Sequence, residues 1–156
     1  MDMIDSKLIN LKTHSITSHF VNGFEHSIVN EGQEEFYVKA SPDEFVNRSF
    51  FHIGGTLKGA TEATRKKLNK KYKQSPVVLC PRNNIALIRC KTSHPFGCVW
   101  LVESKIKNIS PYQNNHTLVM MKDGSTIIVD MKLKELQHNR EQASYLCKSF
   151  LESSSF

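Results

Sequence analysis

The chain has 156 residues, which is enough for one domain with a substantial core and short for two. Hydrophobic residues make up 39% and aromatic residues 9% of it, as in a folded globular protein, and no stretch approaches the roughly 20 apolar residues that cross a bilayer. The formal net charge of +6 directs attention to polyanionic partners.

The first 19 residues are polar, with scattered apolar positions, and we expect residues 1–19 to be weakly ordered. Asp2 and Asp5 stand where a signal peptide would carry lysines, and no apolar segment follows. We therefore expect a cytoplasmic protein with no membrane partner. The four cysteines should then be reduced, buried thiols.

From residue 20 the pattern predicts a hairpin and then a short helical turn. Asn22-Gly23 is a strong hairpin signal between apolar residues. We expect the return strand at residues 27–29 and another strand from residue 34 to residue 38. Pro42 would open a helical turn that ends at Asn47. Residues 49–53 read as a strand, and His52 within them as a core histidine.

Residues 58–73 hold the positive charge of the chain. They carry seven basic residues and one acid, whereas the rest of the chain has equal numbers of each. Such a segment is the electrostatic footprint of a polyanion-binding surface. There are two alternatives: the segment is a solvated face that only maintains solubility, or it binds an acidic membrane or protein. The predicted DNA contacts are Lys58, Arg65, Lys66, Lys67, Lys70, Lys71 and Lys73, with Arg48 and Arg82 as secondary candidates near predicted turns.

The secondary structure of this basic segment stays open at this point. Ala60, Thr64, Leu68 and Tyr72 recur every four residues, which would give a helix with a thin inward stripe. Tyr72, among lysines, could contact nucleic acid or anchor the segment to the domain.

The second half of the chain reads as β structure followed by one helix. Strands are expected at residues 77–80, 85–90, 98–102, 117–121 and 126–129. The run at 98–102 is apolar throughout, which suits a strand covered on both faces and favours core packing for Trp100. Asp123-Gly124 should supply the positive φ angles of a tight turn.

The last element has one apolar face of an amphipathic helix, with members three and four residues apart. They are Leu133, Leu136, Arg140, Ala143, Cys147 and Phe150. The sum predicts an α+β fold: a single domain at residues 20–152, with an antiparallel, meander-rich β-sheet and a C-terminal amphipathic helix.

Motifs for catalysis, metals and cofactors are weak. Residues 54–61 nearly spell a phosphate-binding loop, but Ala60 stands where the motif needs lysine. The glycines could still offer amides to a DNA phosphate, or simply form a turn. Cysteine and histidine spacings match no zinc site, and no nucleophile has a recognisable partnered base. We expect no catalytic residues, no metal and no cofactor.

The sequence resembles the ComK family of bacterial competence transcription factors from about Phe20 to Phe150. The specificity lies in many landmarks at matching spacing. They are Phe36-Tyr37-Val38, Pro42, Val46, Arg48-Ser49, Gly54, Gly59, Thr64, Pro76, Pro81-x-Asn83-x-Ile85-x-Leu87, Pro95, Cys98, Trp100, Asp123-Gly124, Tyr145-Leu146 and Phe150.

The resemblance implies a DNA-binding activator of genes for DNA uptake. It implies binding of A/T-rich promoter boxes through the minor groove, as a homodimer or a dimer of dimers. RNA polymerase and a Clp protease adaptor are the implied protein partners. Six neutralised phosphates would give a slope of log K against log salt of roughly −5. One departure is that Ala60-Thr61-Glu62 follows Gly59, where the family tends to carry basic residues.

Two other function classes remain as alternatives. An RNA-binding β domain would stack bases on exposed aromatic side chains. A small enzyme would use Cys80 or Cys98 as its nucleophile.

Overall fold

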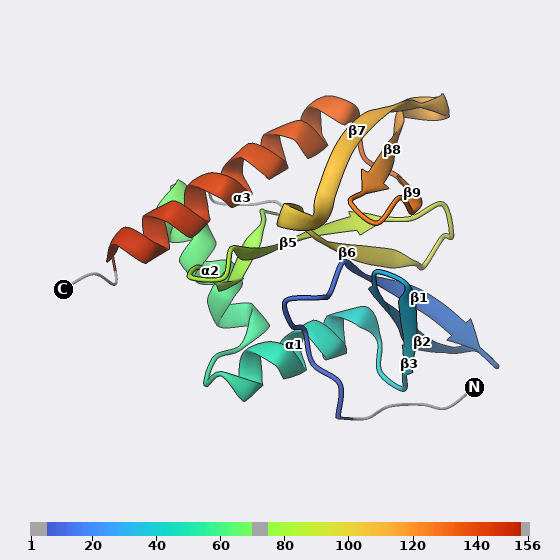
Figure 1. Cartoon of the computed structure of the whole chain (residues 1–156), viewed down its shortest axis with the longest axis horizontal. Helices are drawn as coiled ribbons and strands as arrows, with labels where there is room; N and C mark the ends of the chain where they lie inside the picture. Colours follow the sequence, from blue (N-terminus) through green and yellow to red (C-terminus); the bar gives the residue numbers. More distant parts are fainter. Residues whose placement is uncertain (1–5, 70–74, 154–156) are drawn as a thin grey trace.

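The computed structural model describes residues 6–69 and 75–153, and Figure 1 shows how their elements are arranged. Two short 3₁₀ turns flank β7, at Glu103–Lys105 and Gln113–Asn115. In chain order, the strands and helices are β1 (Ser15–Val21), β2 (Phe24–Glu31), β3 (Glu34–Val38), α1 (Pro42–His52), α2 (Leu57–Leu68), β4 (Val77–Cys80), β5 (Ile85–Lys91), β6 (Cys98–Val102), β7 (Ile106–Tyr112), β8 (His116–Met121), β9 (Thr126–Val129) and α3 (Leu133–Ser153).

The strands form two antiparallel sheets. The larger has the order β3-β2-β1-β6-β5-β4, which is two three-stranded meanders joined where β1 pairs with β6. Ile16 lies opposite Trp100 in that junction. The smaller sheet has the order β7-β8-β9. The predicted α+β class with antiparallel meanders is therefore confirmed, although the strands divide between two sheets.

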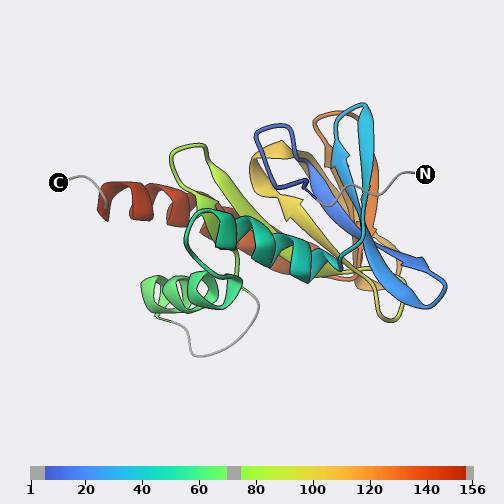
Figure 2. The same ribbon diagram turned by 90° about the horizontal axis from the view of Figure 1, so that it is seen from below.

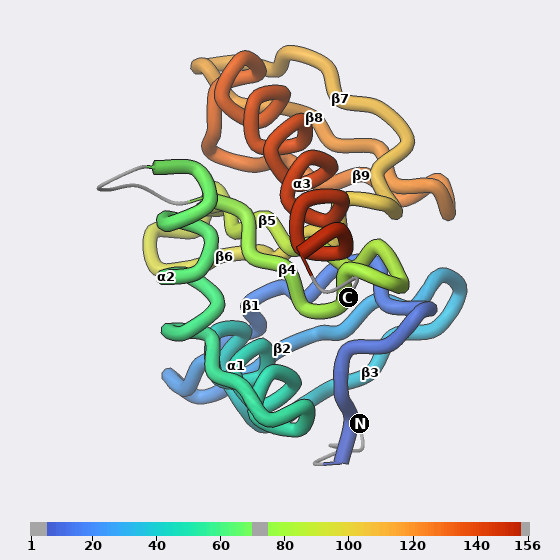
Figure 3. The backbone as a smooth tube through the Cα atoms, turned by 90° about the vertical axis from the view of Figure 1, so that its left-hand side faces the viewer, coloured from blue at the N-terminus to red at the C-terminus, as the bar shows by residue number. Residues whose placement is uncertain are grey.

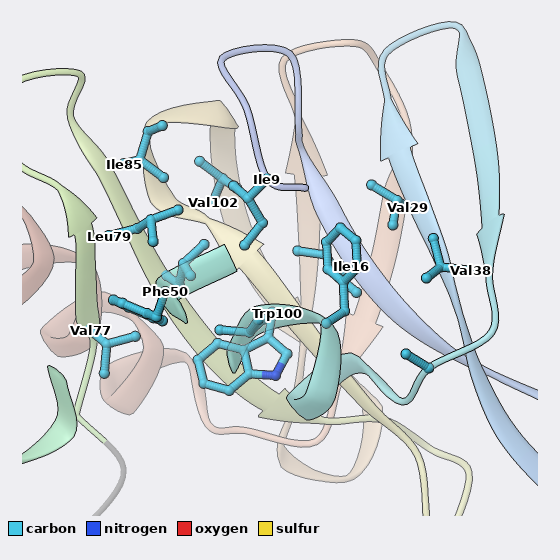
Figure 4. Close-up of a cluster of buried hydrophobic side chains, with 14 of the residues drawn as sticks. Ile9, Ile16, Val29, Val38, Phe50, Val77, Leu79, Ile85, Trp100 and Val102 are labelled. Atoms are coloured by element: carbon cyan, nitrogen blue, oxygen red, sulfur yellow. The ribbon is translucent and has the colours of Figure 1, made fainter. Parts of the chain in front are cut away.

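The six-stranded sheet is covered on both faces. One face packs against α1 in a core that includes Ile16, Trp100 and Phe45. Figure 4 shows side chains from both meanders converging there around the Trp100 indole. The other face meets β7–β9 and α3 through residues such as Leu101 and Leu136. All five residues of β6 are buried, so the predictions of a doubly covered strand and a core Trp100 are confirmed.

Helix α1 corrects the sequence prediction for residues 42–53. The helix was expected to stop at Asn47 and a strand to follow, but one helix runs to His52. Its buried positions are three or four apart, because one side faces the sheet, and Phe51 is exposed on the other. The strand prediction for residues 49–53 was wrong because two adjacent phenylalanines suit a strand as well as a helix. His52 is exposed, not a core residue.

Two turns show how local chemistry sets the register. Asn22 (φ 50°) and Gly23 (φ 82°) form the predicted tight hairpin between β1 and β2. Between β8 and β9 only Gly124 has positive φ, at 90°. Asp123 contributes instead as an acceptor, from the amide of Ser125 at 3.0 Å and its hydroxyl at 2.6 Å. The hairpin was predicted correctly and the role of Asp123 was not.

Two segments depart from expectation at the edges of the fold. β1 begins at Ser15, and Ile9 is buried in the main core, both within the segment that was expected to be weakly ordered. β7 was not predicted. It is an edge strand with mostly exposed residues and a proline near its end, so its sequence lacks the apolar alternation of a buried strand.

The predicted C-terminal helix is present as α3. Leu136, Ala143 and Cys147 are buried on the predicted face. Arg140, also on that face, is paired with Glu103 at 3.1 Å. Among the described residues, none of the helices has the length and apolar character that crossing a membrane requires.

Candidate nucleic-acid interface

The basic segment forms helix α2 as far as Leu68, and its caps explain where it begins and ends. The Thr56 hydroxyl accepts a hydrogen bond from the Gly59 amide at 3.0 Å, and the Asn47 side chain of α1 accepts from the Leu57 amide at 2.9 Å. Asn69 closes the helix in the left-handed conformation, at φ 52°. These caps fix the start of α2 against α1.

A thin inward stripe attaches α2 to the domain. Leu57 and Ala60 pack against the main core, and Thr64 is 1% exposed. This confirms the predicted four-residue recurrence as far as Leu68. The basic residues fall outside the stripe, and Lys58, Arg65, Lys66 and Lys67 are all exposed. Three of them lie in the last turn, where cations interact favourably with the negative end of the helix dipole.

The cations of α2 do not all face the same way. At about 100° per residue, Lys58, Arg65 and Lys66 fall within about 100° of one another, and Lys67 falls about 160° from Arg65. We call Lys58, Arg65 and Lys66 the α2 cations. Glu62 lies among them and lowers their net charge. They form one basic strip along the exposed side of α2, and Arg65 lies at the edge of the strip, beside the sheet.

Lys67 turns towards the C-terminal helix instead. Its ammonium donates to the Ser153 hydroxyl of α3 at 2.8 Å and lies 5.7 Å from the centroid of the Phe150 ring. The structure therefore gives Lys67 a role in holding α2 against α3. The sequence offered no signal for this separation, because the two partners are 86 residues apart.

Of the remaining predicted contacts, Arg82 lies away from the α2 cations. Lys70, Lys71, Lys73 and the aromatic candidate Tyr72 lie outside the described residues. Figures 2 and 3 show α2 on one side of the molecule and the β4–β5 turn, which carries the exposed Arg82, on the opposite side.

Arg48 lies on α1, next to Asn47, and is half-buried. It therefore belongs to a helix and not to a predicted turn. Its neighbour Asn47 contacts α2 through the Leu57 amide.

The glycine-rich loop between α1 and α2 is a turn. The amides of Gly54 and Gly55 donate to the Phe51 and Phe50 carbonyls at 3.0 and 2.9 Å, which caps α1. Gly54 has φ 87°, where side chains are disfavoured. Because these amides are used within the protein, and a helix precedes the loop where the phosphate motif needs a strand, the loop lacks the geometry of a phosphate cradle.

A pocket of about 400 Å³ lies between α2 and the sheet. Arg65 lines it from α2 and Arg89 from β5. Asp43 of α1 accepts from Arg89 at 2.9 and 3.1 Å and from the Trp100 indole nitrogen at 2.8 Å. The hydrogen bond from Arg89 to Asp43 raises the pKa of the guanidinium, so Arg89 stays charged. Sequence reasoning missed this cluster, because Asp43 is 46 residues from Arg89 and 57 residues from Trp100.

All four cysteines are free thiols, as predicted. Cys90, Cys98 and Cys147 are buried, whereas Cys80 is only half-buried, contrary to the prediction. Burial raises the pKa of Cys90 to about 12 and that of Cys147 to about 11, and it also raises the pKa of Cys98. These thiols are therefore protonated and weakly nucleophilic near neutral pH. In the described ranges, no three histidine, cysteine, aspartate or glutamate side chains group as metal ligands.

Comparison with known proteins gives one result. No curated protein and no solved structure matches the chain. The family model described as ComK protein matches residues 4–154, nearly the whole chain. The chain therefore belongs to the ComK family, a family of competence transcription factors.

Proposed function

We propose that this protein activates DNA-uptake genes by binding A/T-rich promoter duplexes through the minor groove, with the α2 cations contacting the phosphates. Family membership supports the competence role. The single structural observation that supports the DNA contact is the strip of exposed cations on α2.

The chemistry of the α2 cations suits the backbone of a duplex. Exposed arginine and lysine side chains neutralise phosphates and release condensed counterions, which gives affinity without reading the sequence. The negative potential of a narrow A/T minor groove also attracts inserted arginine or lysine. α2 is attached along one side to β4 and the core, so only its outer side is open to a duplex.

Several parts of the proposal rest on the family resemblance alone. These are activation, the minor-groove mode, location in the cytoplasm and assembly as a homodimer or dimer of dimers. Contacts with RNA polymerase and a Clp adaptor belong with them. All of these depend on the contact between the α2 cations and DNA, and that contact can be tested directly.

The test is a titration of A/T-rich and G/C-rich duplexes at several salt concentrations, with single-stranded RNA as competitor. Replacing Lys58, Arg65 and Lys66 together by alanine should lower affinity for the A/T duplex. It should also make the slope of log K against log salt less negative by about 2.7, because about 0.9 is expected for each lost phosphate contact.

The matched control replaces three exposed lysines outside α2, namely Lys12, Lys107 and Lys122. Lys12 and Lys122 lie near the contact between His14 and Asp123, and the figures show the β8–β9 turn opposite α2. The control loses the same charge and should largely keep the wild-type slope. An equal loss in both variants would show a nonspecific charge effect. Preference for RNA over the A/T duplex would favour the RNA-binding alternative.

A further inference from the structure

The loop between β5 and β6 presents an aromatic side chain to solvent. Phe96 is 83% exposed, the largest value among the large hydrophobic side chains described as exposed. Burying such a ring stabilises an association, and leaving it in water gives no benefit to folding. Single exposed apolar residues are common, so the surroundings of Phe96 must decide whether it has a role.

Those surroundings hold the loop in one conformation. The Thr92 amide donates to the Gly97 carbonyl at 3.2 Å, and the Gly97 amide donates to the His94 carbonyl at 3.1 Å. The Phe96 amide donates to His94 Nδ1 at 3.2 Å. The His94 ring in turn stacks on Phe20 of β1, with centroids 4.3 Å apart. The loop is therefore pre-organised, and its ring needs little ordering on binding.

Gly97 makes this compact loop possible. A Cβ atom at that position would lie 2.5 Å from the Thr92 hydroxyl and 3.2 Å from the His94 Cβ. Gly97 is buried while its neighbour Phe96 is exposed. The loop is thus built around a position that only glycine fills without movement, and the residue just before it, Phe96, is exposed.

The loop lies on the same side of the molecule as the α2 cations. Successive strand residues point to opposite faces, so Arg89 and Lys91 of β5 share the sheet face that packs against α1. Arg89 lines the pocket beside Arg65 of α2, and the exposed Lys91 comes directly before the loop. Figures 2 and 3 show α2 and the β5–β6 loop along one flank, and Figure 1 shows them towards opposite ends of the molecule's longest axis. A partner that contacts α2 can therefore extend to Phe96.

We propose that Phe96 is an apolar wedge that enters a base step of the A/T-rich duplex from the minor groove, with Lys91 on a flanking phosphate. This inference rests on the proposed function. Minor-groove proteins insert phenylalanine or other apolar side chains between base pairs, which unstacks the step and bends the duplex. Pyrimidine–purine steps such as TA unstack most easily, so the wedge favours A/T-rich sites that contain them.

Phe24 provides a matched control. It is also a phenylalanine next to a turn, at 70% exposure. In the β1–β2 register it lies opposite Val21, whereas Phe20, which stacks on His94, lies opposite Glu25. Phe24 therefore points to the other face of the sheet and away from the proposed interface.

The experiment uses the full chain and an A/T-rich duplex with 2-aminopurine at a central TA step, because the emission of this base rises on unstacking. Wild-type protein should raise the emission on binding. Phe96→Ala should abolish the rise and weaken binding about tenfold, the size of one lost base–aromatic contact, with the salt slope unchanged. Phe96→Leu should keep part of both effects, and Phe24→Ala should behave as wild type.

The outcomes separate the two proposals. If wild-type protein does not bind the A/T duplex, the proposed function fails. The wedge is wrong and the proposed function stands if wild-type protein binds while Phe96→Ala keeps wild-type affinity. The same holds if wild-type protein binds without raising the emission, or if Phe96→Ala raises it as much as wild-type protein does. Circular dichroism of each variant shows that it is folded. A Phe96→Ala variant that changes the salt slope would make the loop a phosphate contact and would also overturn the wedge.

Discussion

Two adjacent lysines of α2 give the sharpest test of the interface. Lys66 is exposed on the strip with Lys58 and Arg65, whereas the Lys67 ammonium donates to the Ser153 hydroxyl of α3 at 2.8 Å. The two residues are both lysines, lie on the same helix and carry the same charge. Replacing each by alanine therefore changes one variable, the direction of the side chain.

The magnitude follows from counterion release. One lost phosphate contact makes the salt slope less negative by about 0.9, which amounts to roughly fivefold weaker binding at about 0.15 M salt. We expect this change for Lys66→Ala. For Lys67→Ala we expect almost no change in slope, and a stability effect within the roughly 0.5 kcal/mol of ordinary surface substitutions.

The assay is fluorescence anisotropy with an A/T-rich duplex at five salt concentrations, together with urea unfolding of each variant. Equal slopes for both variants would mean that the side chains act only through total charge. A larger slope change for Lys67→Ala would place the duplex between α2 and α3 and would refute the strip defined by Lys58, Arg65 and Lys66.

Three further predictions concern stability and the loop. Asp43→Ala should cost about 2 kcal/mol, because the indole N–H of the only tryptophan loses its carboxylate partner, and should shift the Trp100 emission in urea titrations. Burial raises the pKa of Asp123, but hydrogen bonds from Ser125 outweigh it and lower the pKa overall. The stability that this pair gives is therefore present above the ordinary aspartate pKa of about 3.9 and is lost as pH falls through the lowered value. Ser125→Ala should cost about 1 kcal/mol in urea unfolding at pH 7 and less in acid; an equal cost at both pH values would contradict this. Gly97→Ala should distort the β5–β6 loop and weaken A/T-duplex binding although every cation remains, as a gel-shift titration would show; unchanged binding would mean that the loop does not contact the duplex.

The sequence predicts elements best where local chemistry decides them. Asn22-Gly23 permits few conformations besides a tight turn, and the predicted hairpin forms there. The apolar run at 98–102 could only be covered on both faces. By contrast, residues 49–53 suit either a strand or a helix, and the contact of α1 with the sheet decides between them. Tertiary packing is not visible in a short window of sequence.

The candidate site shows the same division. Charge concentration located α2, and the four-residue recurrence of Ala60 and Thr64 predicted which side would be buried. The direction of Lys67 depends on α3, and the pairing of Asp43 with Arg89 depends on a contact between α1 and β5. Phe96 carried no signal, because a phenylalanine in a loop gains its meaning only from the side of the molecule that it faces.

Charge alone cannot explain a preference for A/T-rich DNA. Phosphates are the same in every sequence, so contacts from Lys58, Arg65 and Lys66 can set affinity and register but cannot choose a site. If this protein selects its promoters, the selection must come from groups that enter a groove or sense how easily the duplex deforms. On the flank that carries the α2 cations, the pre-organised loop with Phe96 meets that requirement by shape. The two ends of the flank then divide the work, with α2 holding the backbone and the β5–β6 loop testing the base step.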